Sequence, residues 1–355
     1  MNFPFSASFP YFFYFLILLA LLPYKSIKSK KQIISILLIC LIGVFVTYEG
    51  NFSDWITYRE YVEGCHYVGC TYFESGYDLL TFIASQTFGF EIIPLFSLLL
   101  LFVALLMFRH NDNTFFFIIT ISILFAFLPL YFGGIRQSLS FSLLIISFVF
   151  FYYKKYFLSL LFTLVAVLFH LSAIVMFVSF ISFYFFYNFI KNKNFVTILI
   201  STFGLYLLGI LFMEMIFDSI KIIDSFNPGR KMVHSNMNGL KSLLLPIERF
   251  IILGMSLYLF YKLKADRLFF LISLIGICGA IFYLIVYQYS LNTAGRVVAF
   301  FRFSDLVIIF YFLKFILSKK GSFNRYYINN LSILGILTYS LIKFYFTIVS
   351  VGFFA

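Results

Sequence analysis

Charged residues are scarce in this sequence. Asp, Glu, Lys and Arg make up 11% of the 355 residues, whereas hydrophobic residues make up 63% and aromatic residues 23%. Soluble domains carry about 25% charged residues, and no hydrophilic segment is long enough to form a separate soluble domain. The composition therefore excludes an ordinary soluble protein and predicts a single integral membrane domain over residues 1–355.

A dense basic patch is lacking as well. The formal net charge is +12, but the Lys and Arg residues are spread over short loops between apolar runs. A nucleic-acid-binding surface gathers its positive charge on one face, whereas scattered basic loops are typical of membrane topology signals. We therefore expect the lipid bilayer as the surroundings and no nucleic-acid partner.

Long apolar runs are what the sequence has instead. An apolar stretch of roughly 20 residues crosses a bilayer, and cutting at charge clusters and at Gly or Pro predicts about twelve spans in an all-α polytopic protein. They are 9–24, 33–48, 91–108, 114–132, 137–153, 156–169, 170–187, 195–217, 246–262, 267–289, 296–317 and 328–350. The alternative for 156–187 is one long tilted helix instead of two spans divided at His170.

The basic loops predict the orientation of these spans. KSIKSKK (25–31), YYKKY (152–156), KLKADR (262–267) and the other basic clusters fall on alternate loops, which the positive-inside rule places in the cytoplasm. Both termini and two long loops, 49–90 and 218–245, are then outside. Within the first, the apolar stretch 77–90 is short for a span and favours an interfacial or re-entrant helix.

Two cysteines lie in the first outer loop. Cys65 and Cys70 flank the sequence HYVG, and only His66 lies near them, which leaves too few ligands for zinc. An oxidising exterior favours a disulfide between them. The chain also has no Asp-x-Asp pair. We expect neither a metal nor a cofactor.

The placement of arginine points to an anionic substrate. Lysines mark the cytoplasmic loops, but six arginines map to the outer face or just inside it: Arg59, Arg136, Arg230, Arg249, Arg296 and Arg302. A guanidinium group binds phosphate through a planar fork, so their gathering suits a lipid-linked phosphate or pyrophosphate. The alternatives are structural, because Arg59 is spaced to pair with Glu63 on a helix and Arg302 with Asp305.

Arg136 is the strongest candidate among them. It lies in YFGGIRQSLSF (131–141), where the Gly133-Gly134 break predicts that it falls in the first turn of the next helix. A helix N-terminus already carries about half a positive charge, so a cation there is favourable only if an anion binds too. His170 is either a core histidine or a base near the outer end of a span. Asp54 and Glu74 are alternative bases.

Four motifs occur in an order that resembles one known family. They are Asp-Trp-x-x-Tyr-Arg-x-Tyr at 54–61, Glu-x-Gly-Tyr at 74–77, Gly-Gly-Ile-Arg-Gln-Ser-Leu at 133–139 and Phe-His-x-Ser-Ala at 169–173. This order is similar to that of the EpsG-type family, which contains exopolysaccharide and Wzy-like O-antigen polymerases of bacterial inner membranes. The resemblance runs from about residue 45 to 190, and GRVVAFFRFSD (295–305) looks like the family's late arginine-bearing segment. The sequence departs from the family at Ser75, where proline is expected.

The resemblance implies a multi-span glycosyltransferase with a GT-C-like architecture. Such an enzyme transfers a glycan from undecaprenyl pyrophosphate to a lipid-linked repeat unit on the periplasmic face of the inner membrane, and a chain-length regulator protein is a further expected partner. The residues themselves give Arg136, His170, Asp54 and Glu74 as the candidate catalytic residues. The candidate substrate-binding residues are Arg59, Gln137, Arg249, Arg296 and Arg302.

Three other functions remain open from the sequence. They are a flippase or transporter for lipid-linked oligosaccharides, a GT-C transferase that adds a single sugar, and a membrane-bound O-acyltransferase. A flippase is expected to show internal repeats and polar residues at the bilayer midplane, and no repeat is visible. An O-acyltransferase needs polar groups on the cytoplasmic side, where this chain offers little besides lysine.

Overall fold

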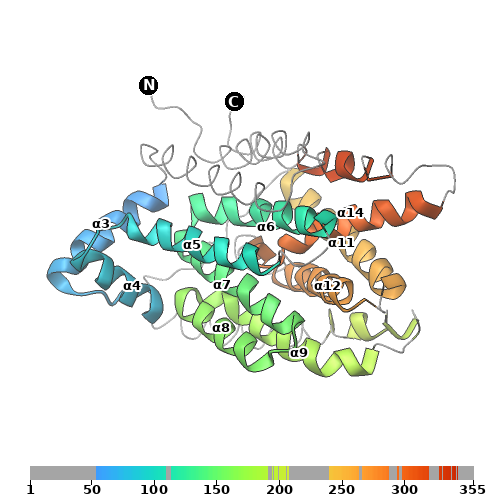
Figure 1. Cartoon of the computed structure of the whole chain (residues 1–355), viewed down its shortest axis with the longest axis horizontal. Helices are drawn as coiled ribbons and strands as arrows, with labels where there is room; N and C mark the ends of the chain where they lie inside the picture. Colours follow the sequence, from blue (N-terminus) through green and yellow to red (C-terminus); the bar gives the residue numbers. More distant parts are fainter. Residues whose placement is uncertain are drawn as a thin grey trace.

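The computed structural model describes residues 53–108, 113–190, 240–263, 266–287 and 298–319, with shorter stretches between 194 and 207, at 294–295 and between 328 and 342. The regular structure in these ranges is helical throughout (Figure 1). The predicted spans 9–24 and 33–48 lie outside the described residues. The predicted outer loop 218–245 also lies outside them up to residue 239.

The described helices follow the apolar runs closely. They are α3 (Ser53–Val68), α4 (Ser75–Gln86), α5 (Ile92–Met107), α6 (Asn113–Gly133), α7 (Ile135–Tyr152), α8 (Tyr156–Phe169), the 3-10 helix η1 (Leu171–Ala173), α9 (Ile174–Ile190), α11 (Leu240–Leu263), α12 (Arg267–Tyr287) and α14 (Phe303–Lys319). By length and composition, α7 and α12 are able to cross a bilayer, and further described helices are apolar but shorter.

Helix α7 lies at the centre of the bundle, because it packs against α5, α6 and α8. Every side chain from Ser138 to Val149 is buried. Its serines bind neighbouring helices: Ser138 Oγ lies 2.8 Å from Ser97 Oγ on α5, and Ser140 Oγ donates to the carbonyl of Ala166 on α8 at 2.9 Å. Small polar residues of this kind let helices approach closely and join them where no water is available.

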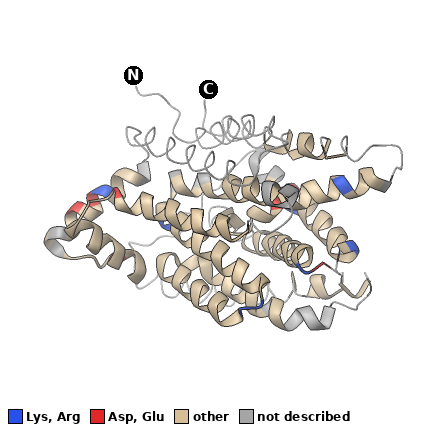
Figure 2. Cartoon of the chain, in the orientation of Figure 1, with Lys and Arg blue, Asp and Glu red and all other residues tan. Residues whose placement is uncertain are grey.

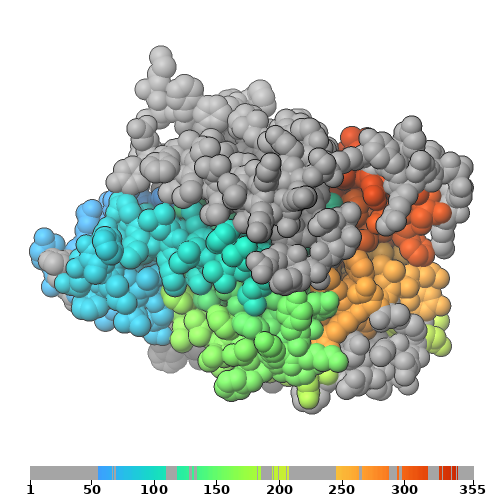
Figure 3. All heavy atoms as spheres, in the orientation of Figure 1, coloured from blue at the N-terminus to red at the C-terminus, as the bar shows by residue number. Residues whose placement is uncertain are grey.

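Two basic loops meet at one end of this bundle. Arg267, at the start of α12, donates from Nη2 to the carbonyl of Phe151 at 3.0 Å and to the hydroxyl of Tyr156 at 3.1 Å. The loop between α7 and α8 therefore lies beside the loop between α11 and α12, which agrees with their predicted placement on one side. Helices α3 and α4 form one end of the long axis (Figures 1 and 3).

Charged residues are sparse along the described helices, as Figure 2 shows, and several of them gather on α3. Helix α4 has one buried face, which includes Tyr77 and Ala84, and an opposite face on which Leu79, Phe82 and Ile83 are 62%, 47% and 45% exposed. An apolar exposed face on a short helix fits the membrane interface. The interfacial helix predicted over 77–90 thus corresponds to α4, which begins two residues earlier.

Two predicted boundaries have clear outcomes. The division at His170 is confirmed, because α8 ends at Phe169 and His170 adopts an extended conformation (φ −157°, ψ 115°) before η1 begins. The predicted span 296–317 is wrong in its first turns, because residues 300–302 form a turn and α14 starts at Phe303. The sequence is apolar on both sides of this turn, so hydrophobic periodicity alone did not reveal it.

Candidate active site

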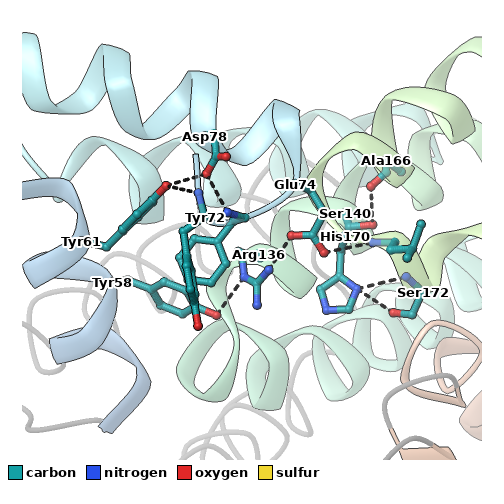
Figure 4. A network of polar contacts seen from close by, with 12 residues as sticks. Tyr58, Tyr61, Tyr72, Glu74, Asp78, Arg136, Ser140, Ala166, His170 and Ser172 are labelled. Atoms are coloured by element: carbon teal, nitrogen blue, oxygen red, sulfur yellow. Dashed lines mark hydrogen bonds and ion pairs between the residues drawn. The ribbon is translucent and has the colours of Figure 1, made fainter. Parts of the chain in front are cut away.

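Four segments that carry the sequence motifs converge at the end of the bundle formed by α3 and α4 (Figure 4). Arg136 is at the centre. Its Nη1 is bonded to Glu74 Oε2, and its Nε donates to the hydroxyl of Tyr58 at 3.0 Å. The guanidinium carbon lies 4.1 Å from the centre of the Phe73 ring. A cation held against aromatic rings and a carboxylate has a fixed position and orientation.

The sequence explains why Arg136 lies there. Helix α6 ends at Gly133 and α7 begins at Ile135, so Gly134 alone separates the two helices. Trp55 on α3 donates from Nε1 to the carbonyl of Tyr131 at 3.0 Å, and Tyr58 follows Trp55 by one helical turn. Residues three apart share one face of a helix, so α3 binds the end of α6 and the start of α7 together.

Glu74 joins two other segments to this arginine. It directly precedes α4, and its Oε1 accepts the backbone N–H of Leu171 at 3.2 Å. Gly76 permits this approach, because a Cβ there would lie only 2.9 Å from Leu168 Cβ at the end of α8. Burial is the largest single influence and raises the pKa of Glu74, but the positive charge of Arg136 and the backbone hydrogen bonds, including that from Leu171, together outweigh it, so the pKa is lowered. Glu74 is therefore an ionised carboxylate at neutral pH.

His170 lies beside Glu74, at the break between α8 and η1 (Figure 4). Its Nδ1 accepts the backbone N–H of Ser172 at 3.3 Å and lies 2.6 Å from Ser172 Oγ. An Nδ1 that accepts a hydrogen bond carries no proton, so the neutral ring has its proton on Nε2. The imidazole also packs against Phe300, with 6.1 Å between ring centres, which brings the segment before α14 to the same site.

Arg249 makes its contacts inside the bundle. Its side chain is 3% exposed, and its Nη2 lies 2.6 Å from Glu248 Oε1 and 2.9 Å from Asp305 Oδ2. The hydroxyl of Tyr339 donates to Glu248 Oε1 at 2.7 Å. Asp305 is therefore paired with Arg249. The ion pair between Asp305 and Arg302 that the sequence spacing allowed is not formed. Arg302 lies in the turn before α14.

The remaining predicted residues are placed less completely. Arg59 Nη2 lies 3.8 Å from Glu91 Oε1. The ion pair with Glu63 that its helical spacing allowed is not the one that the structure has. Gln137 follows Arg136 and folds back over Gly134, where an added Cβ would lie 3.2 Å from its Oε1. Asp54 is part of α3, but its side chain is not described, and Arg296 lies outside the described residues. Within the described part of the chain, no three His, Cys, Asp or Glu side chains gather to hold a metal.

Sequence reasoning missed three residues of this site. Tyr58 holds Arg136, Phe73 packs under the guanidinium, and Ser172 orients His170. A signal existed for Tyr58 and Ser172, because both belong to the motifs at 54–61 and 169–173. Phe73 had none, since one phenylalanine among 55 in the chain carries no distinguishing pattern.

The structure pairs Cys65 and Cys70 in a disulfide, with 4.9 Å between their Cα atoms. Gly69 has a positive φ of 86°, and its N–H bonds the carbonyl of Cys65 at 3.1 Å, so the chain turns sharply at the end of α3.

We expect Cys65 and Cys70 to resist thiol labelling in the unreduced protein and to react after reduction. Closing so short a loop stabilises the fold by about 2 kcal/mol, so the doubly serine-substituted protein is expected to remain folded. The measurement is mass spectrometry of alkylated peptides. Cys278 is the internal control, because it is free and its thiol state does not depend on the reductant. Full labelling of both Cys65 and Cys70 before reduction would rule out the disulfide.

Comparison with protein families gives one match. The EpsG family, a Wzy-like polymerase family, matches residues 32–354, which is nearly the whole chain and extends beyond the region of the four motifs. No curated protein and no solved structure gives a significant match.

Proposed function

We propose that this chain, which belongs to the EpsG family, polymerises lipid-linked oligosaccharide repeat units. The growing glycan would leave undecaprenyl pyrophosphate and be transferred to a hydroxyl of the next lipid-linked unit. The observation that carries the proposal is the convergence of Arg136, Glu74 and His170, from three motifs far apart in sequence, at one end of a helical bundle.

Arg136 supplies the positive charge that the leaving group needs. As the bond between the anomeric carbon and the phosphate oxygen breaks, negative charge grows on the pyrophosphate, and a preorganised guanidinium lowers the barrier. The hydrogen bonds of Arg136 to the described residues use Nε and Nη1, so Nη2 is the group assigned to the anion. The first backbone N–H groups of α7 add to its attraction.

Glu74 is the base in this proposal. The attacking hydroxyl must lose its proton as it bonds to the anomeric carbon, and an ionised carboxylate beside the arginine accepts that proton. His170 has the complementary role. Because its Nδ1 already accepts from Ser172, its Nε2–H donates a hydrogen bond, which orients the hydroxyl or a phosphate oxygen.

The location of the site agrees with chemistry on the outer face. Arg136, Glu74 and His170 lie at the opposite end of α7 and α8 from the basic residues near Arg267 and Tyr156. If the basic loops face the cytoplasm, as the positive-inside rule predicts, the site faces the periplasm. That face is where lipid-linked units are joined in this proposal.

Deletion of the gene tests this function. Cells that lack a polymerase are expected to display single repeat units and no long chains, because export of the units is intact. Cells that lack a flippase display neither. The measurement is gel electrophoresis of the surface glycan, with the wild-type gene on a plasmid as the control. Loss of all repeat units, or wild-type chain length with an altered acyl group, would contradict the proposal.

A further inference from the structure

A pocket of about 520 Å³ opens on another face of α3 from the one that holds Arg136. Arg59 and Glu63 line it from α3, Tyr67 lines it near the end of that helix, and Phe90 and Glu91 line it from the turn directly before α5. Arg59 and Glu63 are one and five residues beyond Tyr58, which at 3.6 residues per turn places them on a neighbouring face. The volume is within the range of small-molecule sites.

We propose that this pocket is a glycan subsite, which binds sugars of the repeat unit or of the growing chain beside the reaction centre. The inference rests on the proposed polymerase function and extends it to the recognition of its substrate. The ligand class is an oligosaccharide of neutral or amino sugars.

The side chains in this pocket suit sugars. A pyranose ring has an apolar face of C–H groups that packs on an aromatic ring, and Tyr67 offers such a ring at 85% exposure. Sugar hydroxyls both donate and accept hydrogen bonds, and carboxylates and guanidinium groups satisfy them through planar pairs of atoms. Arg59 and Glu91 are 42% and 39% exposed, so both are accessible to a ligand.

The charges in the pocket select among sugars. Glu63 and Glu91 carry two negative charges, whereas Arg59 carries one positive charge. The pocket is therefore negative. A glycan with uronic acids would be repelled, and one with amino groups would be attracted.

A covalent bond braces one wall of the pocket, because Tyr67 lies within the loop closed by the disulfide between Cys65 and Cys70. Walls that are fixed before binding lose little conformational freedom when a ligand arrives, which favours recognition of a flexible oligosaccharide.

The sole tryptophan of the chain makes binding measurable. Trp55 lies 5.6 Å from the Phe90 ring, centre to centre, and Phe90 lines the pocket. We would titrate the purified full chain in nanodiscs with maltotriose, with the glucosamine trimer and with trigalacturonate, and follow Trp55 fluorescence. The neutral and amino trimers are expected to produce a saturable change, and trigalacturonate is expected to bind at least several-fold more weakly.

Variants of the pocket separate a subsite from a nonspecific effect. Tyr67→Ser is expected to weaken binding of the favoured trimer about tenfold, which corresponds to about 1.4 kcal/mol, whereas Tyr67→Phe keeps the ring and the affinity. Glu63→Gln is expected to strengthen trigalacturonate binding. Glu60→Gln, on the same helix but outside the pocket lining, is the matched control and changes neither. The absence of saturable binding, or equal binding by Tyr67→Ser, would overturn the subsite.

The subsite and the proposed function fail independently. Arg136→Ala keeps the pocket and is expected to bind the trimers like the wild type. If the trimers bind but gene deletion leaves long surface chains, the polymerase proposal fails and the glycan subsite stands. If the trimers do not bind while deletion abolishes long chains, the subsite fails and the polymerase stands.

Discussion

Arg136→Ala is expected to abolish long glycan chains while the protein stays in the membrane. In the proposed mechanism the substitution removes the charge that stabilises the departing pyrophosphate, and losing one such preorganised group costs about a hundredfold to a thousandfold in rate. Arg136→Lys is expected to fail similarly. A lysine keeps the charge, but it lacks the planar guanidinium group, whose separate nitrogens bind Tyr58 and Glu74 at the same time. The measurement is the length distribution of the surface glycan, with membrane abundance determined in parallel.

Two further variants distinguish a loss of catalysis from a folding defect. Without Arg136, Glu74 is left as a partly buried carboxylate without its counter-charge. The double variant Glu74→Gln and Arg136→Ala also removes that charge. If Arg136→Ala lowers the abundance of the protein, the double variant is expected to restore the abundance but not the long chains. Arg267→Ala, at the opposite end of the bundle, is the matched control and keeps long chains. Wild-type chain length in Arg136→Ala would end the catalytic assignment.

Arg249→Leu is expected to lower the stability of the protein severely. Arg249 is the cation between two carboxylates in a buried network. Removing one partner of a buried ion pair costs about 3–5 kcal/mol, because the remaining charge is left without compensation. We expect little protein in the membrane and a lower thermal unfolding temperature in detergent.

A compensated variant identifies the cause. Arg249→Leu with Glu248→Gln and Asp305→Leu removes all three charges, and apolar replacement of a buried ionic group is often neutral or stabilising. Restored abundance with long chains would mean that Arg249 has a structural role. An Arg249→Leu protein that is abundant yet makes no long chains would instead support the substrate-binding role expected from sequence.

The helices were the most predictable part of the fold. From α5 to α9 and in α12, the apolar runs predicted the boundaries to within four residues, because charged residues or the Gly133-Gly134 break mark most of these boundaries. Helix α3 was not assigned as a helix, because it is polar and aromatic and lies in a predicted outer loop, although its buried residues Trp55, Tyr58, Val62 and Cys65 recur at helical spacing. The turn before Phe303 was missed because the sequence remains apolar across it.

The candidate site was predictable where motifs carried it. Arg136, Glu74 and His170 were all identified before their proximity was known, and the structure brings them together. Contacts between residues on different helices could not be predicted from the sequence. Arg249 was expected at the substrate, and it lies against Asp305, 56 positions later in the numbering. Arg59 was spaced for Glu63 but lies near Glu91. Helical spacing identifies possible partners only on the same helix.

The two hydrogen bonds of Glu74 also set an order for biogenesis. Glu74 is synthesised 62 residues before Arg136 and 97 residues before Leu171. Its carboxylate therefore has no counter-charge until α7 enters the membrane, and its second bond must wait until α8 has been completed. Until then α4 has neither Arg136 nor the end of α8 to bind. The candidate site is complete only in a chain that has inserted through α8 and η1, so under the proposed function a partly inserted chain cannot begin to join glycans.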